Sequence, residues 1–111
     1  MEATVNDTSA LTEAVYYILL SLYRPSHGYG IMQQAESLSR GRVRLAAGTL
    51  YGALNSLTDK GWIRALPVED GSRRKEYCLT EAGEAALRQE LARLKQLVMN
   101  GESILEGQRD E

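Results

Sequence analysis

Several residue types from which cross-links and metal sites are built are scarce in this chain of 111 residues. It has one cysteine, Cys78, one histidine, His27, and no phenylalanine. A single cysteine excludes an intrachain disulfide framework and any multi-cysteine metal site, and a lone histidine excludes a histidine cluster. No pair of carboxylates, glycine-rich phosphate loop or nucleophile–base couple stands out either. We therefore expect no catalytic residues, no metal and no cofactor.

Long apolar segments are also absent. No run approaches the ~20 residues that a membrane-spanning helix needs, and the N-terminus does not resemble a signal peptide. The hydrophobic content of 43% and the charged content of 25% are ordinary for a globular chain, and 111 residues can build one modest core. The sequence therefore predicts a cytoplasmic globular protein that does not contact a membrane.

The net charge of −2 conceals an uneven distribution of charge along the chain. Residues 1–38 carry −3, residues 39–75 carry +5 and residues 76–111 carry −4. A basic middle between acidic ends is expected when one part of a protein meets a polyanion. The same distribution also fits a solvated surface, so charge alone leaves both interpretations open.

Apolar residues at helical spacing predict four helices. The first begins near Leu11 and stops before Pro25, and Ser26 can cap a short second helix. The third spans residues 47–60, and Thr80 can cap a long last helix. These spacings place most of the apolar side chains on one face of each helix.

The segment WIRALPVEDGSRRKEYCLT predicts two strands joined by a turn. The dipeptide DG at 70–71 is a turn signal, and Tyr77 and Leu79 alternate after it. Pro67 restricts the first strand to an edge position or ends it early. A further short edge strand is expected at residues 43–45.

Three helices followed by a two-stranded hairpin, in a mainly α chain, give the order of a winged helix-turn-helix. In that fold the third helix enters the DNA major groove and the hairpin tip lies along the backbone. With its leucines in the core, the third helix turns small side chains outward, which lets its backbone approach base edges. An ordinary solvated face is equally consistent with this pattern. The outward residues are Gly48, Gly52, Asn55, Ser56 and Asp59, with Thr49 at the margin.

Four blocks of sequence, HGYGI, GTLYGAL, KGWI and GSRRKEYCLTEAG, occur in a specific order and spacing. Over about residues 11–88 the chain resembles the PadR family of bacterial transcriptional regulators, and its single C-terminal helix is similar to the short subgroup of that family. The resemblance implies a homodimer that binds double-stranded DNA, usually as a repressor, and a dimer predicts a near-palindromic operator. We expect a winged helix-turn-helix domain over 1–79 and a dimerisation helix with a frayed tail over 80–111.

The family resemblance and the outward face of the third helix each indicate residues that are expected to contact DNA. The resemblance implies contacts for Tyr29, for the turn 48–51 and for the wing 70–76, and the outward face of the third helix adds two polar side chains. Tyr51 is expected either to bind a phosphate or to cover a seam between helices. At Ala46-Ala47, where relatives often carry Ser or Pro, no side chain caps the third helix, so its amides are free to meet a phosphate. The expected DNA-binding residues are Tyr29, Gly48, Thr49, Tyr51, Asn55, Ser56, Arg73, Arg74 and Lys75.

An apolar stripe on the last helix predicts the dimer contact. Its members follow a 4-3-4-7 spacing close to a heptad, and the resemblance implies that the first helix contributes. The alternative is a monomer that packs this stripe against its own first helix. The expected interface residues are Leu11, Val15, Leu87, Leu91, Leu94, Val98 and Leu105.

Two other classes of function stay open. A winged-helix module for protein interaction would share the fold but show no salt-sensitive DNA affinity. A ligand-sensing regulator would release DNA when a small-molecule effector of unknown identity binds in the dimer cleft. No Phe, Tyr or Trp follows Tyr77, which argues against a flat aromatic sandwich on the last helix.

Overall fold

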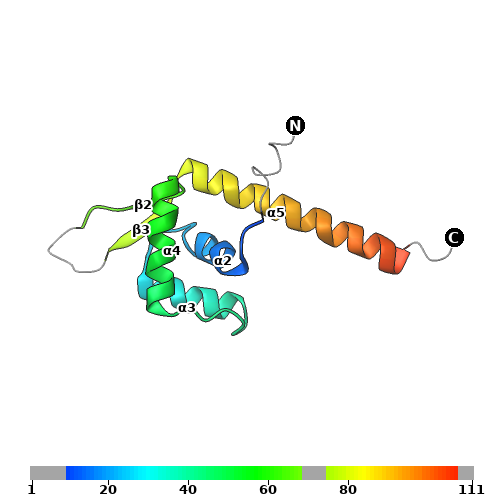
Figure 1. Ribbon diagram of the computed structural model, residues 1–111, viewed down its shortest axis with the longest axis horizontal. Helices are drawn as coiled ribbons and strands as arrows, with labels where there is room; N and C mark the ends of the chain where they lie inside the picture. The colour runs from blue at the N-terminus through cyan, green and yellow to red at the C-terminus, as the bar shows by residue number, and fades with distance from the viewer. Residues whose placement is uncertain (1–9, 69–74, 108–111) are drawn as a thin grey trace.

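The computed structural model describes residues 10–68 and 75–107, and all structural statements refer to these residues. Figure 1 shows the other helices and a small sheet gathered near one end of a long C-terminal helix. Within the described ranges, no helix is both long and apolar enough to cross a membrane. The elements in chain order are α2 (Glu13–Ser21), β1 (Ser26–His27), α3 (Gly28–Leu38), α4 (Ala47–Lys60), β2 (Ile63–Ala65), β3 (Glu76–Leu79), α5 (Glu81–Glu102) and η1 (Ser103–Gly107).

The sheet has three antiparallel strands in the order β1-β3-β2. The predicted hairpin supplies β2 and β3, whereas β1 was not predicted. β3 pairs with β2 through Ile63 and Leu79 and with β1 through Ser26 and Tyr77. A two-residue strand such as β1 has no alternation to detect, so sequence periodicity did not reveal it. The prediction that Ser26 caps the second helix is wrong, because Ser26 lies in β1. The N-cap of α3 is His27, which makes no side-chain capping bond.

The edge strand predicted at residues 43–45 does not form. The chain between α3 and α4 is irregular, and the Val43 N–H donates to the Ser39 hydroxyl at 2.8 Å rather than to a strand. Two cations of this connector form ion pairs within the fold. Arg42 pairs with an acidic side chain of α2 at 2.9 Å, and Arg44 pairs with one of α3 at 3.4 Å. Part of the positive charge of residues 39–75 is therefore paired with carboxylates of the same chain.

The core lies where α2, α3 and α4 meet the sheet and the start of α5. From α4 it receives Leu50, Leu54 and Leu57, as the helical spacing predicted. Burial of these three side chains fixes the rotation of α4 about its axis and leaves its opposite face outside. The buried cluster consists of Ile18, Leu19, Leu22, Ile31, Leu50, Leu54, Leu57, Ile63, Tyr77 and Leu87.

The start of α5 is joined to the end of α4 through Thr80. The Thr80 hydroxyl accepts from the Gly83 N–H at 3.1 Å, which confirms the predicted cap, and donates to the Gly61 carbonyl at 2.6 Å. Gly61 ends α4 in the left-handed conformation with φ 82°. A Cβ at Gly83 would overlap the carbonyl oxygen of Trp62, so glycine is required for this close approach.

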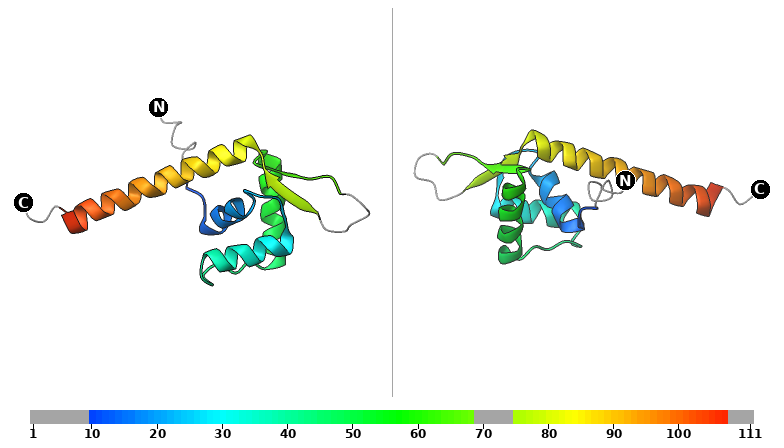
Figure 2. Two further views of the ribbon diagram at one scale, coloured as in Figure 1. Left: turned by 180° about the vertical axis from the view of Figure 1, so that it is seen from behind. Right: turned by 45° about the horizontal axis from the view of Figure 1, so that its top comes forward.

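The first half of α5 packs on the fold, and the second half extends beyond it (Figure 2). Near the middle of the helix, Glu90 is only 5% exposed; it binds Arg93 at 2.6 Å and accepts from the Leu11 N–H at 3.3 Å. The hydrogen bond from Arg93 holds the pKa of the Glu90 carboxyl below its usual range, against the opposing effect of burial. The hydrogen bond from Leu11 to the charged Glu90 carboxylate thus ties α5 to the segment that precedes α2.

Replacing Glu90 with Gln should lower the free energy of unfolding at neutral pH by about 1 kcal/mol, because neutral hydrogen bonds replace charge-assisted ones. The lowered pKa means that the carboxylate contributes fully above the ordinary carboxyl pKa, and that the contribution is lost as the pH falls through the folded pKa. Wild type and Glu90→Gln should therefore converge in acid, which denaturant unfolding at several pH values measures. The control is Glu84→Gln, which removes the exposed pair with Arg88 and should change stability less. Equal losses for both variants would contradict this role.

Candidate nucleic-acid interface

The face of α4 opposite its leucines is exposed, as the sequence predicted. A Cβ added at Gly48 or Gly52 would meet no atom within 4 Å. Glycine inside a helix costs about 1 kcal/mol relative to alanine, and packing within the described fold does not require either glycine. The exposed residues of this face are Gly48, Thr49, Gly52, Asn55, Ser56 and Asp59.

The N-terminus of α4 has no side-chain cap. Ala46 is the N-cap residue, with an extended backbone and no capping bond, as expected from Ala46-Ala47. Amides in the first turn of a helix have no acceptor inside the helix, and they favour anions. The end of α4 is therefore chemically suited to a phosphate.

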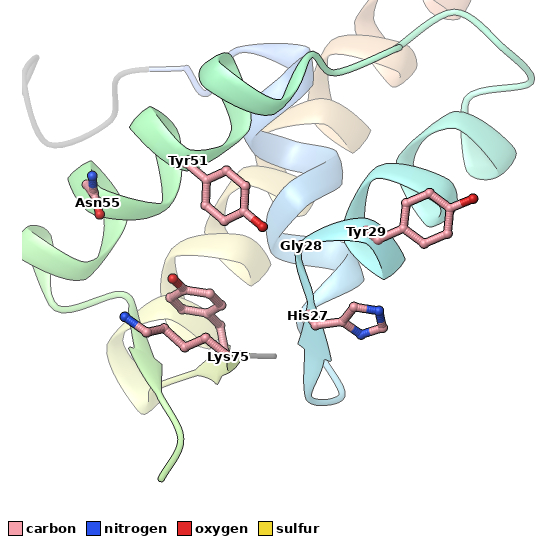
Figure 3. Close-up of a pocket in the computed structure, with 7 residues that line it drawn as sticks. His27, Gly28, Tyr29, Tyr51, Asn55 and Lys75 are labelled. Carbon is pink, nitrogen blue, oxygen red and sulfur yellow. The ribbon is translucent and has the colours of Figure 1, made fainter. Parts of the chain in front are cut away.

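A groove of about 670 Å³ opens beside α4 and brings distant parts of the chain together. Four residues predicted to contact DNA line it, namely Tyr29, Tyr51, Asn55 and Lys75. Figure 3 shows Tyr29 and Asn55 on opposite sides of the groove, with the Tyr51 ring between them. The groove thus joins side chains of α3 and α4 to a cation that directly precedes β3, the central strand of the sheet.

Tyr51 lies across the junction of α3 and α4. Its hydroxyl is directed toward Gly28, the first residue of α3 (Figure 3), and a Cβ at Gly28 would overlap that hydroxyl. The ring therefore covers the seam between the helices, one of its two expected roles, and its hydroxyl stays at the wall of the groove. The neighbouring Tyr29 is exposed, and its hydroxyl accepts from Gln33 Nε2 at 3.3 Å.

Positive charge reaches the groove through Lys75, which is exposed. Arg73 and Arg74, predicted with Lys75 as the wing cations, lie outside the described residues, as does the predicted turn. Lys60, at the end of α4, lies 4.8 Å from the centre of the Trp62 ring and does not line the groove. Lys75 is therefore the predicted wing residue that the structure brings to the site.

Two further residues line the groove that the sequence did not assign to it, His27 and Tyr77. Tyr77 is 7% exposed, and burial, followed by the effect of Tyr51, raises the pKa of its hydroxyl. Alternation in the sequence marked Tyr77 as a strand residue only. The pairing of β3 with β1, which local sequence does not reveal, brings both residues to the groove.

The residues predicted for the dimer interface divide into a packed group and an exposed group. Three members pack in or against the core of their own protomer: Leu11, Val15 and Leu87. Leu94 is half-buried. The exposed members are Leu91 (40%), Val98 (56%) and Leu105 (72%), and further exposed apolar residues absent from the predicted set are Leu97, Met99 and Ile104.

Helices α2, α3 and α4 pack with the small sheet, and one face of α4 is exposed. This arrangement defines a winged helix-turn-helix protein with a long C-terminal helix. The family model for the transcriptional regulator PadR-like family matches residues 16–89, so the chain belongs to that family. A curated relative, an uncharacterized 37.1 kDa protein in transposon TN4556 of Streptomyces fradiae, is 42% identical over 66 residues. That match covers 60% of this chain but only 18% of the relative's length.

Solved structures of the same family share the fold. A PadR family transcriptional regulator from Eggerthella lenta aligns with a TM-score of 0.67 at 29% identity, covering 83% of this chain and 80% of that chain. Bacillus subtilis PadR, solved in complex with operator DNA, aligns with a TM-score of 0.58 at 27% identity, covering 69% of this chain and 46% of that chain. The predicted family and fold class are confirmed.

Because Gly52 has open space around it, Gly52→Ala should raise the free energy of unfolding by roughly 0.5–1 kcal/mol. Gly83→Ala is the matched control: the added methyl would overlap the backbone carbonyl oxygen of Trp62, so stability should fall. Thermal or denaturant unfolding of the two variants and the wild type measures both effects. A loss of stability in Gly52→Ala would mean that the folded chain requires glycine at this position for its own stability.

Proposed function

We propose that this chain is a homodimeric repressor that acts in the cytoplasm and binds a near-palindromic operator in double-stranded DNA, with α4 in the major groove. The exposed face of α4 carries this proposal. Its two glycines lower helix stability and fill no packing need in the described fold, which is explained if the helix backbone must approach bases closely. Asn55 on the same face can bind adenine through two hydrogen bonds, and Thr49 can contact a thymine methyl.

The groove beside α4 suits the DNA backbone. Phosphate oxygens accept hydrogen bonds from tyrosine hydroxyls and lysine ammonium groups, which hold a protein in register without reading sequence. Tyr29, Tyr51 and Lys75 are such donors, and all three line the groove. We assign Arg73 and Arg74 of the wing to the same role because three consecutive cations match a polyanion.

The exposed half of α5 supports the homodimer. The C-terminal helical segment extends beyond the rest of the fold (Figure 2) and carries two exposed members of the predicted set, Val98 of α5 and Leu105 of η1. Leu91, which borders the cavity beside α2, is 40% exposed. Apolar residues at near-heptad spacing are buried when a second helix packs along them. A two-fold dimer also presents two copies of α4, which matches a near-palindromic site.

A second function, release of DNA by a small molecule, is favoured by a cavity of about 170 Å³ between α2 and α5. Its walls are mainly apolar and aromatic, and they include the Glu84–Arg88 ion pair, so a small apolar molecule that carries a polar group fits its chemistry. The apolar and aromatic lining residues are Tyr16, Leu20, Tyr23, Leu87 and Leu91. A molecule bound there would contact both helices assigned to the dimer. Such an effector would raise the melting temperature of the protein and weaken its affinity for DNA.

Asn55→Ala and Lys75→Ala should separate base reading from phosphate binding. Asn55→Ala should cost on the order of 1–3 kcal/mol on the preferred DNA sequence only, with the salt dependence nearly unchanged. Lys75→Ala should weaken binding to all sequences alike and lower the salt slope by about one per subunit. Titration of both variants with preferred and random duplexes over a salt series provides the measurement. Equal losses on both duplexes for Asn55→Ala would contradict base reading, and no salt-dependent affinity of the wild type for any duplex would favour a protein-interaction module.

Val98→Asp should convert the dimer to folded monomers, because the new carboxylate would be buried without a partner in the interface. Val98 is 56% exposed in the protomer, so the fold itself should tolerate the change. Asn100→Asp, which adds the same charge two residues away and outside the predicted stripe, is the control and should remain dimeric. Analytical ultracentrifugation distinguishes the two states. A folded dimer of Val98→Asp would place the interface elsewhere.

A further inference from the structure

The α5 helix carries two different apolar surfaces, one on each side of Leu94. Before Leu94, Leu87 and Leu91 line the cavity between α2 and α5. After Leu94, the helix extends beyond the fold (Figure 2), and its apolar side chains are exposed. In this second part the apolar stripe lacks one member of its heptad spacing, at Gly101, although α5 continues as a helix to Glu102.

The protomer does not require glycine at position 101. A Cβ there would meet no atom of the described residues within 4 Å, and glycine inside a helix lowers its stability relative to alanine. Large, exposed apolar side chains lie three or four residues before and after it, at the spacing of neighbours on a helix surface. They make the glycine the floor of a recess, called here the Gly101 recess, which is explained if a partner packs closely against it. The four side chains are Leu97, Val98, Ile104 and Leu105.

A second copy of this chain offers a matching surface. If two α5 helices pack antiparallel about a two-fold axis at Leu94, a residue seven positions after Leu94 on one copy faces the residue seven positions before it on the other. Gly101 of one copy then faces Leu87 of the other. Leu87 lines the cavity together with Leu91 and Tyr23, and the last two are exposed. The Gly101 recess would therefore lie over the cavity of the second copy, and apolar surface would cover apolar surface.

Charges on one side of α5 favour the same register. Arg88 and Glu102 are 14 residues apart, close to four helical turns, so they lie on the same side of the helix. Arg88 is six residues before Leu94 and Glu102 is eight residues after it, and both are exposed. An antiparallel pair therefore places Arg88 of each copy beside Glu102 of the other, whereas a parallel pair in register would place Arg88 beside Arg88. Charge complementarity thus indicates a second copy in the antiparallel direction.

The same axis suits the spacing of the proposed DNA site. Leu94 lies 13 residues after Glu81, the first residue of α5, which is a rise of about 20 Å. The two α5 helices would therefore begin about 40 Å apart, close to one turn of DNA, roughly 34–36 Å. Thr80 joins the start of α5 to the end of α4, so the two α4 helices would be spaced in the same way. An axis at Leu105 would nearly double this separation.

We propose that the second copy docks in this register: α5 packs antiparallel on α5 about an axis at Leu94, the Gly101 recess lies on the α2–α5 cavity of the other copy, and Arg88 pairs with Glu102 across the interface. The inference rests on the homodimer proposed above. It adds the direction, the register and three residues that the predicted interface lacks. Because each copy closes the cavity of the other, a molecule bound in the cavity would compete with the C-terminal segment of the partner.

Gly101→Leu separates this register from an apolar stripe with an empty gap. A leucine that filled an empty gap would tighten the dimer. In the proposed register it fills the recess and forces the helices apart, so the dissociation constant of the full chain should rise at least about tenfold. Gln96→Leu, on the opposite side of α5, is the matched control and should leave the constant unchanged. Analytical ultracentrifugation measures the constant, and circular dichroism should show no loss of helix in either variant.

Arg88→Glu should weaken the dimer several-fold at low ionic strength, because it places two carboxylates together, and adding Glu102→Arg should restore the wild-type constant. A Gly101→Leu dimer as tight as wild type or tighter would overturn the register while leaving the homodimer intact. So would an Arg88→Glu variant that Glu102→Arg does not rescue. A folded wild type that stays monomeric would instead overturn the homodimer, and this register with it.

Discussion

Burial of one leucine face of α4 is the constraint on which the candidate interface depends. Leu50, Leu54 and Leu57 are enclosed by the core, and exposing one such side chain costs about 1.5–3 kcal/mol. Rotation of α4 about its axis is therefore strongly opposed. Because the helix has 3.6 residues per turn, the same constraint holds Asn55 and the two open glycines on the outer side. The core thus determines which face is available to a partner.

The groove depends on contacts between elements rather than on α4 alone. Gly28 lets the Tyr51 ring lie across the junction of α3 and α4, and the pairing of β1 with β3 sets Tyr77 beside the same junction. At the other end of α4, Thr80 joins the last turn to the start of α5. The helix proposed to enter the DNA groove and the helix assigned to the dimer are therefore connected by short, directional bonds, so the position of one constrains the other.

Local signals in the sequence were sufficient for the parts of the fold that depend on neighbouring residues. The leucine spacing of α4, its bounds at residues 47–60 and the Thr80 cap are properties of single helices, and each was predicted correctly. The errors concern pairing between distant segments. The local sequence predicts that Ser26 caps a helix, but in the folded chain Ser26 instead pairs with Tyr77 of β3. Residues 43–45 were predicted to form a strand, but they pair with no strand of the described sheet.

The site shows the same division between local and tertiary information. Helical periodicity alone identified the outer face of α4. In contrast, His27 and Tyr77 are brought to the groove by the pairing of β3 with the two-residue strand β1, which periodicity cannot detect.

We propose that two symmetric copies of α4 read DNA sequence. Selection of duplexes from a random library by the full chain tests it most directly. We predict enrichment of a near-palindrome whose half-sites are separated by about one helical turn, roughly 10 base pairs. Enrichment of no sequence, or of a single asymmetric half-site, would contradict it.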